Sequence, residues 1–73
     1  MAEGSSRAIL YTAPNCGVSD WAREDLTAEG VDFEERDVMK EKAWFDEALK
    51  HSIFVPILIR DGKVEVGWKG RVG

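Results

Sequence analysis

The fold of this chain is decided by residues 8–20, which read AILYTAPNCGVSD. The first four of these residues are apolar in succession, as in a strand that is covered on both faces. Pro14 breaks the run, and Cys16, the only cysteine of the chain, follows two residues later. A helical pattern begins at Gly17. This stretch therefore places a thiol between a strand and a helix N-terminus, where a thiolate is electrostatically favoured.

Two amphipathic helices are predicted, over residues 17–29 and 39–50. Gly30 suits the position after the first helix, and Asp37 is a plausible N-cap for the second. Their apolar residues recur at helical spacing: Val18, Trp21, Ala22 and Leu26 in the first, and Trp44, Phe45, Ala48 and Leu49 in the second. We therefore expect both helices to bury these residues, tryptophans included, against a sheet.

Four strands are predicted. Residues 7–12 and 53–59 are apolar runs, which are typical of central strands, whereas residues 31–38 and 64–68 alternate and suit sheet edges. The first two strands are joined through a helix and should be parallel, with a right-handed crossover. Asp61-Gly62 predicts a hairpin between the last two.

The resulting α/β fold has the element order β-α-β-α-β-β and a mixed four-stranded sheet in the order second, first, third, fourth. Pro56 cannot donate to a strand ladder, so it must lie at the mouth of its strand. Cys16 and Pro56 then lie at the same end of the two central strands. That convergence makes Cys16 a candidate nucleophile.

Composition excludes several other classes of protein. The 73 residues are expected to form one small domain, 1–73, with residues 1–6 as a flexible tail. A net charge of −4 without a basic run argues against a nucleic-acid or membrane surface, and no apolar stretch approaches the ~20 residues of a membrane span. One cysteine and one histidine provide no metal site and no internal disulfide. A cytoplasmic location is therefore expected.

Several motifs together resemble the glutaredoxin-like branch of the thioredoxin fold. They are Tyr11-Thr12-x-Pro14-x-Cys16, Asp37-Val38, Val55-Pro56, and Asp61-Gly62 followed by Gly67. The resemblance extends from Arg7 to Trp68, without the family's last helix. The chain is also similar to very small bacterial glutaredoxin-like proteins in which selenocysteine sometimes occupies the cysteine position.

The resemblance implies a thiol–disulfide oxidoreductase of cell redox homeostasis that transfers electrons through Cys16. Pro56 would be in the cis form, and the backbone of Val55 would bind the substrate. Three residues at the start of the first helix would support the sulfur: Gly17, Val18 and Ser19. Four further residues are candidates for bordering the substrate: Tyr11, Gly67, Trp68 and Lys69. Core packing of Tyr11 and a solubilising role of the Lys69 charge are the alternatives. Ala13 stands where the family has a glutathione-binding lysine, and Gly70-Arg71 replaces its Asp-Asp pair.

Ser19 cannot resolve a mixed disulfide, so the co-substrate would be glutathione, another small thiol or a protein thiol, with no tightly bound cofactor. The hydroxyl of Ser19 either donates a hydrogen bond to the thiolate or is solvated in the first helical turn. The negative charge of Asp20, in the same turn, opposes thiolate formation. Two alternative functions stay open. One is an iron–sulfur carrier with a cluster held between two copies of Cys16. The other is a non-catalytic binding module, or a homodimer, that uses the sheet face left uncovered near Trp68.

Overall fold

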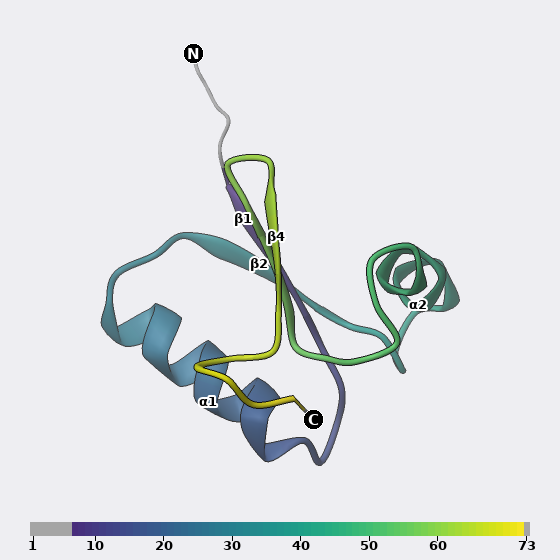
Figure 1. The fold of residues 1–73 in the computed structure, drawn as a ribbon, viewed down its shortest axis with the longest axis horizontal. Helices are drawn as coiled ribbons and strands as arrows, with labels where there is room; N and C mark the ends of the chain where they lie inside the picture. The colour runs from purple at the N-terminus through teal and green to yellow at the C-terminus, as the bar shows by residue number, and fades with distance from the viewer. Residues whose placement is uncertain (1–6, 73) are drawn as a thin grey trace.

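The sheet has four strands in the order expected from the sequence. A computed structural model describes residues 7–72, so the expected tail over residues 1–6 lies outside the described part. The elements are β1 (Ala8–Thr12), α1 (Gly17–Ala28), β2 (Phe33–Asp37), α2 (Lys42–Leu49), β3 (Ile57–Arg60) and β4 (Lys63–Val66). The strand order is β2-β1-β3-β4. Figure 1 shows the ribbon, with the strands running between the two helices. β2 is parallel to β1, the other pairs are antiparallel, and no helix follows β4 in the described residues.

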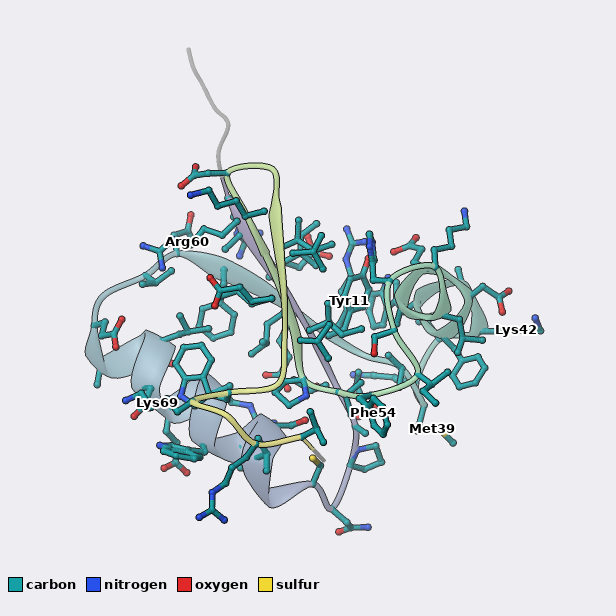
Figure 2. The ribbon with its side chains drawn as sticks, viewed as in Figure 1. Tyr11, Met39, Lys42, Phe54, Arg60 and Lys69 are labelled. Carbon is teal, nitrogen blue, oxygen red and sulfur yellow. The ribbon has the colours of Figure 1, made fainter. Side chains whose placement is uncertain are left out.

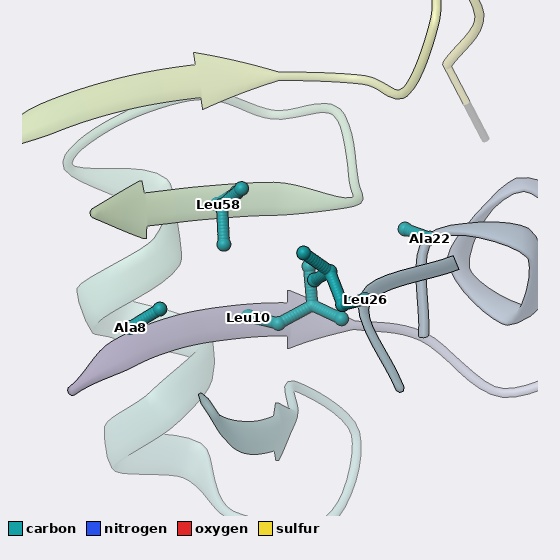
Figure 3. Close-up of a cluster of buried hydrophobic side chains, with 5 residues drawn as sticks. All are labelled: Ala8, Leu10, Ala22, Leu26 and Leu58. Atoms are coloured by element: carbon teal, nitrogen blue, oxygen red, sulfur yellow. The ribbon is translucent and has the colours of Figure 1, made fainter. Parts of the chain in front are cut away.

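The two helices cover opposite faces of this sheet. Leu10 of β1 packs with Ala22 and Leu26 of α1 (Figure 3), whereas the next residue, Tyr11, packs with Ala48 of α2. Successive residues of a strand point to opposite faces, so the sheet lies between α1 and α2. Figure 1 shows the helices on either side of the strands. Burial on both faces explains the continuous apolar run of β1.

Helix α1 follows its prediction closely. It ends at Ala28, and Gly30 adopts the left-handed conformation after it, with φ 75°. Ala22 and Leu26 are fully buried, whereas Trp21 is half-buried rather than a core residue. The buried face of α1 is therefore narrower than the predicted stripe.

Helix α2 is shorter than predicted, because residues 38–40 form a turn. Asp37 does not cap the helix. Its Oδ1 accepts from the backbone N–H of Met39 at 2.8 Å, and its carbonyl accepts from Lys40 at 3.0 Å. A short polar side chain that satisfies its own turn in this way delays a helix. The N-cap is Glu41, whose side chain makes no capping bond.

The predicted apolar stripe of α2 is only partly buried. Ala48 is buried and Trp44 half-buried against the sheet, but Phe45 and Leu49 are 40% and 46% exposed. Apolar residues thus lie on both sides of a two-turn helix, and the sheet covers only one side.

β3 is also shorter than its apolar run. It begins at Ile57, after a cis peptide bond between Val55 and Pro56, and pairs with only three residues of β1. Ile53 and Phe54 lie in the preceding loop and are 79% and 46% exposed. The first half of this run is therefore surface loop rather than central strand.

The chain after β4 closes the α1 face of the sheet. Trp68 packs against the cluster around Leu10, and its backbone exchanges two hydrogen bonds with Arg71, at 2.7 and 3.0 Å. Lys69 and Gly70 between them have φ values of 49° and 84°, the conformation of a type I′ turn. This tight turn brings the indole of Trp68 onto the α1 face of the sheet.

Candidate functional site

Cys16 is the N-cap residue of α1, with its sulfur over the first turn. Its backbone is extended, at φ −110° and ψ 109°, and its Sγ accepts a hydrogen bond from the backbone N–H of Ser19 at 3.4 Å. The thiol is free and half-buried. A sulfur in this position receives the unpaired N–H groups and the positive end of the helix dipole, both of which stabilise a thiolate. The donor is Ser19; Gly17 is exposed beside the sulfur, and no residue blocks the space where its Cβ would be.

The loop before Cys16 is a tight turn. Asn15 has φ 58°, the left-handed conformation that asparagine tolerates better than most residues. Pro14 and Asn15 are exposed, and the chain passes from β1 to α1 within four residues. The thiol follows this turn directly, because only residues 13–15 separate Cys16 from β1.

The Val55-Pro56 peptide lies at the same end of the sheet as the thiol. β1 and β3 are antiparallel with Tyr11 opposite Ile57, so the residues after β1 and before β3 leave the sheet at one end. Pro56 is buried, and its carbonyl accepts from Gly67 at 2.7 Å. Neither backbone group of Val55 has a hydrogen-bond partner within residues 7–72. A peptide N–H and C=O are thus without partners at the thiol end of the sheet.

Gly67 holds the C-terminal turn against this loop. Its φ is 85°, and a Cβ at this position would collide with the carbonyl oxygen of Arg71 and lie 3.0 Å from the Val72 side chain. The position therefore requires glycine for its backbone conformation and for the close approach of the chain.

Trp68 and Lys69 contact α1 at Asp25 and Trp21, between one and three turns from Cys16. The Trp68 indole N–H donates to Asp25 Oδ2 at 2.8 Å, and Lys69 Nζ lies 3.1 Å from the same oxygen. Lys69, which is labelled in Figure 2, also lies over the Trp21 ring, with its Nζ 5.8 Å from the ring centroid. These contacts, the Trp68 bond first, hold the pKa of Asp25 below its ordinary value. Both side chains expected near a substrate are therefore engaged within the chain.

Tyr11 ties the sheet to α2. It lies between the strands and α2 (Figure 2) and is 3% exposed. Its hydroxyl donates to Glu47 Oε1 at 2.8 Å. Arg36 donates to the same carboxylate oxygen at 2.6 Å. Burial is the main reason that the pKa of Tyr11 is raised, followed by the bond to Glu47. The structure thus places Tyr11 in the α2 interface.

A charge network that sequence patterns did not reveal fixes the first turns of α1. Arg23 donates to Asp20 at 2.8 Å and, through two nitrogens, to both oxygens of Glu35 on β2, at 2.7 and 2.8 Å. The hydroxyl of Thr12 donates to Glu35 at 2.9 Å. The bond from Arg23 is the main cause of the lowered pKa of Glu35. Arg23 also offsets the negative charge of Asp20 near the thiol.

Ser19 is buried with an unpaired hydroxyl. The residue has 0% exposure, and its Oγ has no hydrogen-bond partner in the described structure. Neither of the two expected roles of this hydroxyl is found, since it is not solvated and does not donate to the sulfur. The backbone of Ser19, rather than its side chain, contacts Cys16.

One open cavity lies at the thiol end of β2. It has a volume of about 320 Å³ and is lined by Glu35, Asp37, Lys40 and Trp44. Residues 7–72 contain no group of three or more potential metal ligands. No helix among them is long and apolar enough to cross a membrane.

A helix-capping thiol beside a cis-proline loop, on a sheet of this order, defines a thioredoxin-fold protein. The solved structures agree. The thioredoxin-like protein BC3987 superposes with a TM-score of 0.81 at 31% identity, over 86% of this chain and 89% of that one. A point mutant of the same protein gives 0.82 at 29% identity, over 86% and 83%.

The sequence also matches the glutaredoxin family model over residues 8–65, and the chain belongs to the glutaredoxin family. A glutaredoxin from Archaeoglobus fulgidus shares the fold, with a TM-score of 0.74 at 23% identity over 90% of this chain and 79% of that one. No curated protein matches the sequence.

Proposed function

We propose that the protein is a monothiol thiol–disulfide oxidoreductase with Cys16 as its nucleophile. The observation that carries the proposal is the half-buried sulfur at the N-cap of α1, which accepts the Ser19 N–H. Membership of the glutaredoxin family supports a thiol or disulfide substrate. The reducing cytoplasm, which suits a chain with one cysteine, is part of this proposal.

Two exchanges complete the reaction. The Cys16 thiolate attacks one sulfur of a disulfide R–S–S–R′, forms Cys16–S–S–R, and releases R′–S⁻, which takes up a proton. A second thiol, R″–SH, loses its proton, and the resulting thiolate attacks the sulfur that carries the group R in the mixed disulfide. R–S–S–R″ leaves, and the Cys16 thiolate is restored. Glutathione or another small thiol would serve as R″–SH, because the chain has no second cysteine.

The backbone of Val55 would align the substrate. Its unpaired N–H and C=O can bond an extended segment beside the disulfide, in the manner of an added strand. Pro56 is the cis residue that sets this loop, and the fixed carbonyl-to-Gly67 bond holds it. Of the expected substrate-bordering residues, Val55 has the strongest support from the geometry.

Turnover of a mixed disulfide tests the proposal. The protein is incubated with a glutathionylated peptide and excess glutathione or a dithiol, and release of the peptide thiol is followed. We expect Cys16→Ser to abolish the protein-dependent rate and Ser19→Ala to retain it, since the sulfur's donor is the backbone of Ser19. A Cys16→Ser variant as active as the parent would disprove the proposal.

This assay, together with two further measurements, distinguishes the proposed oxidoreductase from the alternative functions. A binding module would give no protein-dependent rate with any thiol and an alkylation rate of Cys16 like that of a free cysteine peptide. An iron–sulfur carrier would instead give a coloured dimer on anaerobic reconstitution with iron and sulfide.

A further inference from the structure

The strand β4 is a short sheet edge that carries two charged residues and two exposed valines. It ends the sheet, all four of its residues are exposed, and Val64 and Val66 are 45% and 43% exposed. Lys63 and Glu65 form no ion pair with any other residue between 7 and 72. The opposite edge, β2, differs, because three of its four charged residues, Glu34, Glu35 and Arg36, form ion pairs with other described residues. Unpaired charge and apolar surface thus coincide on β4.

The side chains of β4 are sorted between the two faces of the sheet. Glu65 lies opposite Leu58, which packs toward α1, and Lys63 lies opposite Arg60 on the same face. Val64 and Val66 lie opposite Ile59 and Ile57, on the α2 face. Lys63 and Glu65 therefore form a charged pair of sites on one face, while the valines form an apolar stripe on the other.

The hairpin fixes which backbone groups of β4 point outward. Arg60 and Lys63 flank the two-residue turn, where Asp61 and Gly62 have φ values of 52° and 76°. The residues that flank such a turn form a hydrogen-bonded pair, and hydrogen-bonded and non-bonded pairs alternate along an antiparallel ladder. The N–H and C=O of Lys63 and Glu65 therefore point to β3. Those of Val64 point to the free edge.

We propose that a second copy of this chain pairs with β4 in an antiparallel, two-fold arrangement centred on Val64. In this register Val64 bonds Val64 of the other copy through the outward backbone groups. Lys63 then lies directly opposite Glu65 of the other copy, twice, in the closely spaced non-bonded pairs. A register centred on Glu65 sets two carboxylates against each other, and one centred on Lys63 sets two ammonium groups against each other. Only the Val64 register is complementary in charge.

This arrangement has a consequence for the thiols. The C-terminal end of β4 is at the Cys16 end of the sheet, because Gly67 bonds Pro56 there. Antiparallel pairing turns the two copies in opposite directions, so their thiols lie at opposite ends of an eight-stranded sheet. This dimer leaves both thiols open and is incompatible with a cluster held between two Cys16 residues in the same dimer.

Charge reversal tests the register. Sedimentation of the full chain in reducing buffer, from about 10 µM to about 1 mM, measures the dimer dissociation constant. Lys63→Glu and Glu65→Lys should each weaken the dimer about tenfold or more, since each replaces two attractive pairs by two repulsive ones. The double variant K63E/E65K should restore it. Val64→Pro, which removes the outward N–H and leaves the ladder bonds of Lys63 and Glu65 to β3 in place, should abolish it.

Two controls accompany these variants. Lys50→Glu changes the net charge as Lys63→Glu does, but on an exposed residue away from β4. It should leave the dimer dissociation constant unchanged. Cys16→Ser should dimerise like the parent, so the result does not depend on the proposed redox activity. Near-ultraviolet circular dichroism confirms that each variant is folded. A parent chain that stays monomeric at the highest concentration overturns the proposal, as does a double variant no tighter than the single ones.

Discussion

At the scale of single residues, the backbone and the side chain of Ser19 have different roles. Ser19 donates its N–H to the sulfur, yet its hydroxyl is buried without a partner. Thr12 is buried equally deeply, but its hydroxyl is bonded to Glu35. The two residues form a matched pair for measuring what a buried hydroxyl contributes.

Removal of the two hydroxyls should have opposite effects on stability. Ser19→Ala discards an unpaired polar group and should leave the free energy of unfolding unchanged or raise it by about 1 kcal/mol. Thr12→Val breaks a bond and should lower it by about 1 kcal/mol. Urea denaturation of both variants measures these changes. A clear loss of stability in Ser19→Ala would show that its hydroxyl has a partner.

A cysteine at position 19 should convert the single-thiol site into a site that can form an intramolecular disulfide. The Ser19 N–H lies 3.4 Å from the Cys16 sulfur, and the side chain at position 19 starts one helical turn from it. Ser19→Cys should therefore form an intramolecular disulfide on mild oxidation, seen as a loss of two mass units in a monomer. The parent, treated alike, can form only mixed or intermolecular disulfides. A Ser19→Cys protein with two free thiols after oxidation would contradict this geometry.

At the scale of elements, the sequence predicted types and order better than ends. The strand order, the parallel pair and the capping position of the thiol followed from apolar runs and from Pro14 and Pro56. The start of α2 did not, because Asp37 is an equally good residue for the turn that it makes with Met39. Nor did the exposure of Phe45 and Leu49, since periodicity alone does not say how wide a sheet lies beneath a helix.

Two isoleucines in one apolar run should differ sharply. Ile53 is 79% exposed in the loop, whereas Ile57 is fully buried in β3. Ile57→Ala should lower the free energy of unfolding by about 2–4 kcal/mol, through lost burial and the cavity left behind. Ile53→Ala should change it by less than about 0.5 kcal/mol. Chemical denaturation of the two variants side by side checks the assignment of residues 53–55 to a loop.

At the scale of the whole molecule, two charge networks hold the helices to the sheet. Arg23 and Glu35 hold α1, and Arg36, Glu47 and Tyr11 hold α2. The long-range partners in these networks come from different elements, so no local motif in the sequence reveals them. They were the main part of the site region that sequence analysis missed.

Stability should fall in acid partly through Glu35. Its pKa is lowered in the folded state from an ordinary 4.5, chiefly by Arg23. The stabilisation is therefore present above about pH 4.5 and is lost as the pH falls through the folded value. Thermal unfolding between about pH 6 and pH 2 should show a smaller acid loss in Glu35→Gln than in the parent. An identical acid profile in the two proteins would contradict this role.

The opposite limb of the profile should report on Tyr11, the only tyrosine of the chain. Burial raises its pKa in the folded state above the ordinary 10.0, so folding favours the protonated phenol. This contribution is present below pH 10.0 and is lost as the pH rises through the folded value. Ultraviolet titration should give a higher midpoint in the folded protein than in urea. Equal midpoints would show that the phenol is not held in the α2 interface.

The presence of serine rather than cysteine at position 19 also limits the number of reducing equivalents that the protein can store. A pair of neighbouring thiols stores two electrons as reducing equivalents and releases them later, independently of whether the donor is still present. A chain with one sulfur nucleophile has no such reservoir. In the proposed mechanism, each transfer through Cys16 therefore uses two other molecules in turn, and the rate of turnover depends on the supply of both.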